Sequence, residues 1–260
     1  MNYAKSVFVG RPHLILLFLL AVLIPRTAWS AAVDSVTPYG VGSGDAVSPN
    51  YSVAVNGVAV PVYNNADMSY AHFAFTGTAN VVVTVGQNIS SYQLSPHSFA
   101  LAPSVSGNTV SFALTRPRKV MLHAVNSLNE KLCIFAEAPE EHPPVSGAAN
   151  VTTLSGLDAS GATDVTTQLQ AAVDNTPTGN TLLIPAGRYT FTYLQFRSNK
   201  SYYLAPGAIL QAPRTQEAQL KLNGCTNVKI FGRGVFDDQG DYQRARTGGG
   251  ETGTTFISVD

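Results

Sequence analysis

The chain carries one dense group of charged side chains whose types could do chemistry. Asp237, Asp238 and Asp241 follow one another closely, and Arg244 and Arg246 come directly after them. Two carboxyl groups are a common pair for hydrolysis, because one donates a proton while the other activates water. Adjacent residues on one strand point to opposite faces of a sheet, however, so Asp237 and Asp238 cannot flank one bond together. We therefore expect this cluster to form a turn or the edge of a binding site.

Other residue types that bind metals are scattered along the chain. A metal site would need several histidines to converge from distant strands, so we expect no metal site and no cofactor. The two cysteines, Cys133 and Cys225, leave open either one disulfide or two separate thiols. The histidines beyond residue 30 are His72, His97, His123 and His142.

Residues 1–30 have the layout of a secretory signal peptide. Lys5 and Arg11 precede an apolar run over residues 14–24, and Ala28 and Ser30 are small residues suited to a cleavage site. The run is short for a membrane span, so we expect export to the extracellular space or the periplasm. An uncleaved membrane anchor is the alternative.

Removal of this segment would change the charge of the chain. The segment holds three of the 16 basic residues and none of the 16 acidic residues, which leaves 13 against 16, a formal net charge of −3. A mildly acidic chain lacks the basic surface of a nucleic-acid binder. We expect neither nucleic acid nor, after cleavage, a membrane as a partner.

Residues 31–138 have the pattern of a domain built from short strands. Tyr51, Val53 and Val55 alternate with small or polar residues, Asn56-Gly57 follows, and the alternation resumes at Val58. An Asn-Gly pair between two such runs is a strong signal for a hairpin. Short strands separated by turn residues indicate an antiparallel β-sandwich. Further strands are predicted at 71–75, 81–85, 110–114, 120–124 and 131–136.

A linker and a helix come next. Residues 139–147 (PEEHPPVSG) contain three prolines and two glutamates, which are unsuited to a central strand. Asp164 could then cap a helix that runs to about Asn175. One face of this helix would be apolar, formed by Val165, Leu169, Ala172 and Val173.

Three imperfect copies of one unit follow the helix, at 181–189, 201–210 and 227–238. Alignment pairs Ile184 with Leu204 and then with Ile230, at separations of 20 and 26 residues, and the same step of 26 leads to Phe256. Such periods are typical of stacked repeat architectures. Residues 148–260 are therefore predicted to form a parallel β-helix whose open end the helix covers. Glycines that would bend the chain after each apolar run are Gly187, Gly207, Gly232 and Gly234.

These motifs carry a resemblance to a known family. Gly161-Ala162-Thr163-Asp164, the predicted helix and the three repeats resemble the opening of pectin-lyase-fold proteins, above all polygalacturonase-like glycoside hydrolases. The preceding region and its proline-rich linker look like the amino-terminal module of the dextranase and isopullulanase group. The resemblance implies an all-β chain, in which an antiparallel β-sandwich precedes the helix-capped start of a truncated right-handed parallel β-helix.

The resemblance also implies a function. It predicts a secreted glycoside hydrolase that degrades a polysaccharide of the pectin or α-glucan type. Hydrolysis of a glycosidic bond needs two carboxyl groups, and in the resembled family these aspartates lie on later coils. We therefore expect the chain up to Asp260 to be an inactive fragment that contains no catalytic residue. A polysaccharide lyase on the same fold, and a non-catalytic glycan-binding or adhesive solenoid, are the alternatives.

The substrate-binding residues stay open at this point. Five aromatic residues of the repeats could stack on sugar rings, although strand residues of this kind are more often packed between coils. They are Tyr189, Phe191, Tyr193, Tyr202 and Tyr203.

Overall fold

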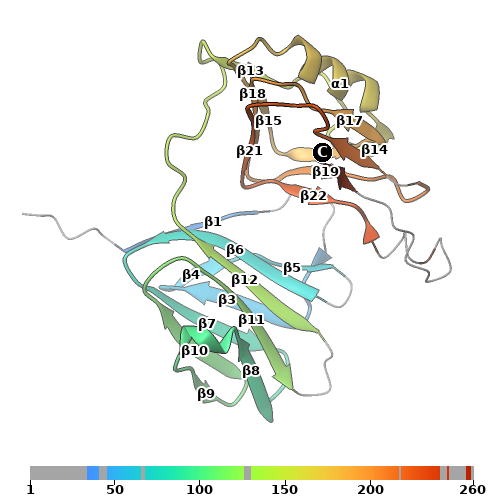
Figure 1. Ribbon diagram of the computed structural model, residues 1–260. Helices are drawn as coiled ribbons and strands as arrows, with labels where there is room; N and C mark the ends of the chain where they lie inside the picture. The colour runs from blue at the N-terminus through green and yellow to red at the C-terminus, as the bar shows by residue number, and fades with distance from the viewer. Residues whose placement is uncertain are drawn as a thin grey trace, which may run out of the picture. The chain divides into compact units, whose positions relative to one another are not determined.

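A computed structural model describes residues 34–40, 46–65, 68–125, 130–216, 218–240, 245 and 256–258. The predicted signal peptide lies outside these residues. The described part is nearly all β, with one α-helix, α1 (Thr166–Asn175), and one short 3-10 helix (His97–Phe99) (Figure 1). Two separate hydrophobic clusters form, one from residues 51–136 and one from residues 154–220. The division at residues 138 and 147 remains a prediction.

The region up to Glu137 contains two sheets (Figure 1). The five-stranded sheet has the order β4-β3-β7-β10-β9, with β3 (Tyr51–Val55), β4 (Val58–Val60), β7 (Ala79–Val85), β9 (Ser104–Ser106) and β10 (Thr109–Leu114). The larger sheet has the order β2-β5-β6-β12-β11-β8, with β1 also paired to β6. Its strands are β1 (Ser35–Pro38), β2 (Ala46–Val47), β5 (Val62–Asn65), β6 (Met68–Thr76), β8 (Ser91–Ser95), β11 (Arg118–Val125) and β12 (Lys131–Glu137).

The predicted alternation of apolar residues places one core between these sheets. Val83 of β7 and Phe73 of β6 belong to different sheets, and both are fully buried in the same cluster. The predicted hairpin is confirmed, because Asn56 and Gly57 connect β3 to β4 with φ of 49° and 79°. Positive φ at both central residues is the geometry that favours Asn-Gly in a two-residue turn.

One strand pair departs from the expected antiparallel order. β12 runs parallel to β6, in the register that pairs Lys131 with Met68. A parallel pair needs a long crossover connection, and the chain between β6 and β12 passes through the other sheet before it returns. The larger sheet is therefore mixed. β12 and β6, which are distant in sequence, run parallel, whereas its other strand pairs are antiparallel.

After residue 150 the chain forms three parallel sheets and visits them in turn, so the predicted parallel β-helix is confirmed. The first β-helix sheet contains β13 (Val151–Thr153), β15 (Thr181–Ile184), β18 (Lys200–Leu204) and β21 (Val228–Gly232). The second contains β14 (Ser160–Asp164), β16 (Gly187–Thr190), β19 (Ala208–Gln211) and β22 (Val235–Asp237). The third contains β17 (Tyr193–Gln195), β20 (Gln219–Lys221) and β23 (Ile257–Ser258).

The predicted register holds between two coils and fails afterwards. Ile184 pairs with Leu204 as expected. Leu204, however, pairs with Gly232, two residues beyond the predicted Ile230. Phe256 lies beside the third sheet, where its carbonyl accepts a bond of 2.7 Å from the Leu220 amide, so its expected equivalence to Ile230 is wrong. The loops between strands absorb insertions, whereas only the strands must keep their pairing.

The backbone conformation of the turns between sheets explains why glycine or asparagine occupies certain positions. Gly232 has φ of 116°, and a Cβ there would overlap the Leu204 carbonyl oxygen, so only glycine fits this predicted bend. Asn199 and Asn227 precede β18 and β21 with φ of 58° and 53°, a conformation that asparagine tolerates. The Asn227 Nδ2 donates to the Asn199 Oδ1 at 3.2 Å, which stacks the two turns.

The helix α1 forms where it was predicted. The Asp164 Oδ1 accepts a bond of 2.8 Å from the Thr166 amide at its start, and Leu169 and Val173 are fully buried. The first coil has no strand in the third sheet, and α1 packs beside β17 in that place. The helix therefore covers an edge as well as an apolar end.

The side chain of Gln170 completes this cover as a neighbouring strand would. Its Oε1 accepts from the Gln195 amide at 2.8 Å, and its Nε2 donates to the Gln195 carbonyl at 3.0 Å. The Thr166 Oγ1 accepts from the Thr192 amide at 2.8 Å in the same manner. Side chains of α1 thus pair three backbone groups along the open side of β17, which reduces its ability to serve as a template for another chain.

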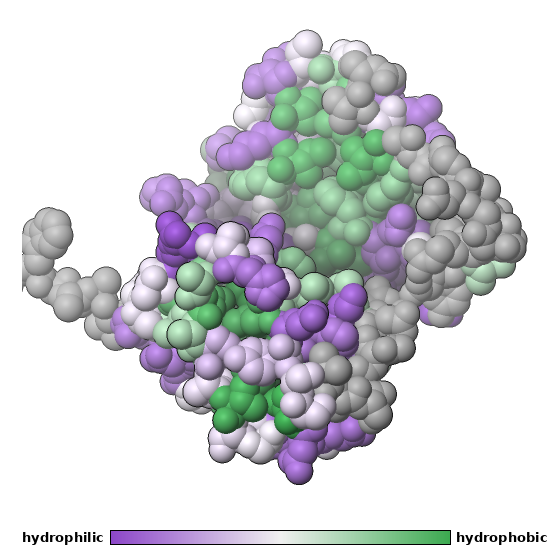
Figure 2. Space-filling view, turned by 60° about the horizontal axis from the view of Figure 1, so that its bottom comes forward, coloured by the Kyte–Doolittle hydropathy of each residue, from purple (hydrophilic) through white to green (hydrophobic). Residues whose placement is uncertain are grey.

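Exposed hydrophobic side chains occur in both regions. Figure 2 shows hydrophobic residues gathered on the visible face of the β-helix region, in the upper part of the view, with hydrophilic residues along part of the margin. In the last described coil, Val235 and Ile257 are among the exposed large hydrophobic residues. No helix in the described ranges is long and apolar enough to cross a membrane.

Candidate functional site

The structure places Asp237 at the end of β22 and Asp238 in the turn that follows. The Asp237 Oδ1 accepts a bond of 2.9 Å from the Gln239 amide, and the Asp238 Oδ1 accepts one of 3.0 Å from the Gly240 amide. These bonds agree with the turn role expected from the sequence. Asp241, Arg244 and Arg246 lie outside the described residues.

Asp237 also belongs to a row of polar side chains on the second β-helix sheet. Thr190 pairs with Gln211, and Gln211 pairs with Asp237, on three successive strands. The Gln211 Nε2 donates to the Thr190 Oγ1 at 2.7 Å, and the Arg188 Nη1 donates to the Gln211 Oε1 at 2.5 Å. The Arg188 Nη1 lies 3.8 Å from the Asp237 Oδ2. We call Arg188, Thr190, Gln211 and Asp237 the polar ladder.

The ladder lies on the outer face of its sheet. Residues that alternate with it point inward and belong to the hydrophobic cluster, namely Tyr189, Leu210 and Phe236. The side chains of Arg188 and Asp237 are only 12% and 25% exposed, so much of their ion pair is shielded from water. Sequence reasoning missed Arg188 and Gln211, although their alternation with Tyr189 and Leu210 was a usable signal.

The ladder can bind but lacks an acid/base pair of its own. Its guanidinium, amide, hydroxyl and carboxylate groups donate and accept hydrogen bonds along one line. Asp237 is its one carboxylate within the described part of the chain. Both of its carboxylate oxygens already face partners, the Gln239 amide and Arg188. The arrangement therefore fits recognition of hydroxyl groups better than proton transfer.

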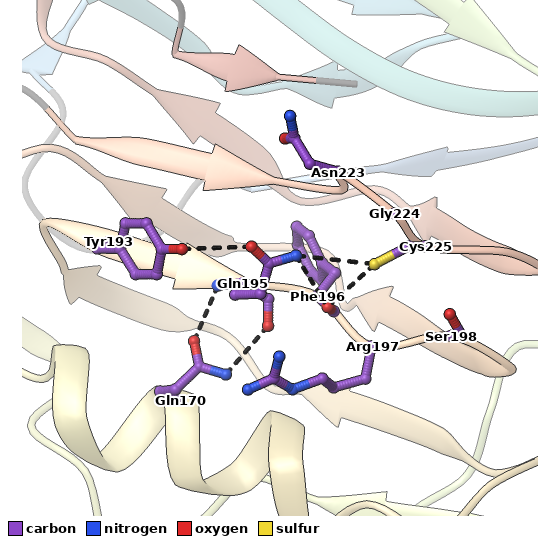
Figure 3. A pocket seen from close by; sticks show the side chains of 9 residues that line it. All are labelled: Gln170, Tyr193, Gln195, Phe196, Arg197, Ser198, Asn223, Gly224 and Cys225. Carbon is purple, nitrogen blue, oxygen red and sulfur yellow. Dashed lines mark hydrogen bonds between the residues drawn. The ribbon is translucent and has the colours of Figure 1, made fainter. Parts of the chain in front are cut away.

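A hollow of about 560 Å³ lies beside α1 (Figure 3). Gln170 reaches it from the helix, Tyr193 and Gln195 from β17, and the other side chains from the loops after β17 and β20. None of its lining residues is a carboxylate or a histidine. They are Gln170, Tyr193, Gln195, Phe196, Arg197, Ser198, Asn223, Gly224 and Cys225.

Gln195 is held at the centre of this hollow, as Figure 3 shows. Its Oε1 accepts from the Tyr193 hydroxyl at 3.2 Å. Its Nε2 lies 3.3 Å from the Lys221 carbonyl oxygen and 3.4 Å from that of Phe196. The Cys225 thiol donates to the same Phe196 carbonyl at 3.2 Å. The polar wall of the hollow is therefore rigidly positioned.

Arg197 provides the charge in the hollow. Its Nε donates to the Asp174 Oδ1 at 2.6 Å, and its backbone amide donates to the Tyr202 hydroxyl at 2.9 Å. The hydrogen bond from Arg197 lowers the pKa of Asp174, against the opposing effect of burial, and the same bond raises the pKa of Arg197. The pair stays ionised and nearly neutral as a unit.

The remaining candidates from the sequence carry no site in the described residues. No group of three or more His, Cys, Asp and Glu there could hold a metal ion. Burial, followed by the charges of Arg233 and Lys119, lowers the pKa of His72 to about 4, so this histidine is neutral at pH 7. Cys133 and Cys225 are separate free thiols, which decides between the two alternatives.

Of the five aromatic residues predicted as stacking candidates, four are buried, and all of these except Tyr203 belong to the hydrophobic cluster of the β-helix. They are Tyr189, Phe191, Tyr202 and Tyr203. Tyr193 differs from them, because it is 40% exposed and lines the hollow.

Comparison with known proteins gives a likeness at the level of structure. No family model matches the sequence, and no curated protein matches it. Among solved structures, Dex49A from Penicillium minioluteum superposes with a TM-score of 0.53 at 16% identity, over 77% of this chain and 47% of that chain. A family 28 exopolygalacturonase from Yersinia enterocolitica gives a TM-score of 0.31 at 17% identity, over 62% of this chain and 39% of that chain.

This chain shares the fold of Dex49A. The predicted pectin-lyase-type β-helix is therefore confirmed as a fold. The likeness covers 77% of the chain, whereas residues 148–260 make up less than half of it, so the likeness extends into the preceding two-sheet region. The chain spans about half the length of Dex49A.

Proposed function

We propose that this chain is the amino-terminal part of an exported glycoside hydrolase that degrades a polysaccharide of the α-glucan or pectin type. The observation that carries the proposal is the shared fold with Dex49A, a dextranase, across both the β-helix and the region before it. The signal-peptide pattern of residues 1–30 supports export. The fold alone does not define an activity, so the proposal depends on the site as well.

The chemistry of the polar ladder supports this proposal. Sugar hydroxyls both donate and accept hydrogen bonds, and the ladder offers both kinds of partner on one shielded face. In the family that the sequence resembles, the aspartate after the Gly-x-Gly motif lies near the start of the substrate groove. Asp237 follows Gly232 and Gly234 in this way. We assign Arg188, Gln211 and Asp237 to substrate contact, and the catalytic carboxylates to other residues.

The test uses the product of the complete open reading frame. We expect it to release reducing ends from at least one of dextran, pullulan, polygalacturonan and rhamnogalacturonan. No release from any of the four would contradict the hydrolase proposal. Unsaturated products and a need for calcium would instead identify a polysaccharide lyase.

A non-catalytic glycan-binding protein is the second candidate. The observation that favours it is the single carboxylate of the polar ladder within the described residues, since hydrolysis needs two. A protein of this kind would be retarded in gels that contain the polysaccharide and would release no sugar from it. Retardation together with sugar release would exclude this candidate.

A further inference from the structure

We propose that the hollow beside α1 binds a neutral saccharide unit of the polysaccharide, at a site separate from the polar ladder. The inference rests on the proposed function for the kind of polymer, and on the side chains of the hollow for the site. The ladder stands on the second β-helix sheet, whereas the hollow is built by α1, β17 of the third sheet and two loops. The two surfaces have no residue in common.

Tyr193 supplies a platform for a sugar ring. Tyr193 is 40% exposed, and its hydroxyl is held by the bond to the Gln195 Oε1. The Lys221 Nζ lies 5.4 Å from the centroid of the ring, which anchors the ring further through a cation-π contact. An exposed aromatic face with an anchored polar end offers apolar contact to the C–H face of a pyranose.

The walls around Tyr193 are already ordered before any ligand binds. Both polar atoms of the Gln170 side-chain amide bond the backbone of Gln195. The side-chain amide of Gln195 in turn bonds the Tyr193 hydroxyl and the backbone carbonyls of Phe196 and Lys221. Side chains that are held in place lose little conformational freedom when a ligand arrives. This rigidity favours recognition of a weakly held ligand such as a single sugar unit.

Several groups of the hollow remain able to bond sugar hydroxyls. The guanidinium of Arg197 has five N–H donors, of which the Nε–H donates to Asp174. The Ser198 Oγ accepts from the Thr226 amide at 3.0 Å, which leaves its hydroxyl hydrogen to donate. Asp174 does not line the hollow but lies next to it as the partner of Arg197; within the described residues both bonds to its carboxylate go to Oδ1, so Oδ2 can accept a hydroxyl hydrogen. Donors and acceptors therefore stand together, as sugar hydroxyls require.

The size and charge of the hollow define the class of ligand. Its volume of about 560 Å³ lies within the range of roughly 300–1,000 Å³ found for small-molecule sites. The one charged lining residue, Arg197, is paired with Asp174 at 2.6 Å. A uronate would have to compete with Asp174 for this guanidinium, whereas a neutral hexose would not. The other nearby cation, Lys221, does not line the hollow, and its ammonium lies against the Tyr193 ring. The hollow thus fits a neutral glucan unit better than a pectin unit.

The test measures binding of isomalto-, malto- and galacturono-oligosaccharides to the full-length protein by saturation-transfer NMR and calorimetry. Tyr193→Ala should weaken binding of a gluco-oligosaccharide about tenfold, because it removes the aromatic platform. Tyr193→Phe keeps the ring and should keep most of the affinity. Tyr92→Ala is the matched control, since Tyr92 is 37% exposed on β8, far from the hollow in sequence. Circular dichroism melting would show that each variant is folded.

Each outcome has a defined meaning. Equal affinity in wild type and Tyr193→Ala, or tighter binding of the galacturonide, would overturn the inference. Sugar release by the same protein is measured in parallel on Tyr193→Ala. If the protein releases sugar but its oligosaccharide affinity does not depend on Tyr193, the binding site in the hollow is rejected and the proposed function stands. If oligosaccharide binding depends on Tyr193 but no sugar is released, the hydrolase proposal is rejected and the binding site stands.

Discussion

Glu130 in the two-sheet region and Lys200 in the β-helix are each 8% exposed, yet their charges are compensated in opposite ways. Among the described residues, the Glu130 carboxylate accepts bonds from side chains, at 2.8 Å from the Asn64 Nδ2 and 3.4 Å from the Ser48 Oγ, and also from Asn50 and Ser69. The Lys200 Nζ instead donates to two backbone carbonyls of α1, those of Val173 and Asp174, each at 2.9 Å.

The difference follows from what each architecture leaves unpaired. Strands use their backbone groups in ladders, so a charge buried among them must find side-chain partners. A helix leaves its last carbonyls without partners and carries partial negative charge at that end, which suits a buried ammonium. Lys200, at the start of β18, therefore joins α1 to a later coil of the β-helix, whereas Glu130 joins segments within the two-sheet region.

The largest expected effect comes from removal of the buried anion. Glu130→Ala removes the acceptor that four side-chain donors share, and should lower the free energy of unfolding by about 3–5 kcal/mol. Glu130→Gln keeps the size and some of the acceptors, so it should cost roughly half as much. Urea unfolding followed by circular dichroism gives both values. Glu141, which is exposed in the predicted linker, provides the control, and an equal loss in Glu141→Ala would contradict the role given to Glu130.

The same carboxylate should make stability depend on pH. Burial raises the pKa of Glu130, but the bonds from Ser69, Asn50, Asn64 and Ser48 outweigh it, and the net pKa is below the ordinary 4.5. Because the folded pKa lies below the unfolded one, this stability is present above pH 4.5 and is lost as the pH falls through the folded pKa. Glu130→Gln should flatten the fall of the unfolding free energy below pH 4.5, while a profile identical to wild type would exclude this linkage.

A smaller effect is expected from the buried cation. Lys200→Met keeps much of the apolar stem but removes two charge-assisted bonds at the end of α1, which should cost about 2 kcal/mol. Lys131→Met, at an exposed position of β12, is the control and should change stability by less than about 0.5 kcal/mol. If the two variants unfold at the same urea concentration, Lys200 does not fasten the helix to the β-helix.

The smallest effect concerns the side chain that imitates a strand. Gln170→Ala removes both bonds to the backbone of Gln195 and should cost about 1–2 kcal/mol. Hydrogen exchange of the Gln195 amide should become faster, because its acceptor is the Gln170 Oε1. Gln168→Ala, on the exposed face of the same helix, should change neither quantity. An unchanged exchange rate of the Gln195 amide in Gln170→Ala would mean that the Gln170 side chain does not protect the edge of β17.

Local patterns were enough to predict most of the elements. The alternation on both sides of Asn56-Gly57 predicted a hairpin, and the apolar spacing after Asp164 predicted α1 with its correct end at Asn175. Each of these signals comes from neighbouring residues, whose backbone preferences do not depend on distant parts of the chain. The pairing of Ile184 with Leu204 was predictable for a related reason, since a short coil leaves little room for a change in register.

Only the tertiary structure decided the features that depend on distant partners. The parallel pairing of β12 with β6, the shift from Ile230 to Gly232 opposite Leu204, and the contact of Arg188 with Asp237 join residues far apart in sequence. Loop lengths between coils vary, so no fixed period could set these contacts. Burial of Glu130 and exposure of Tyr193 likewise depend on which segments pack around them, because a residue's type does not determine its neighbours.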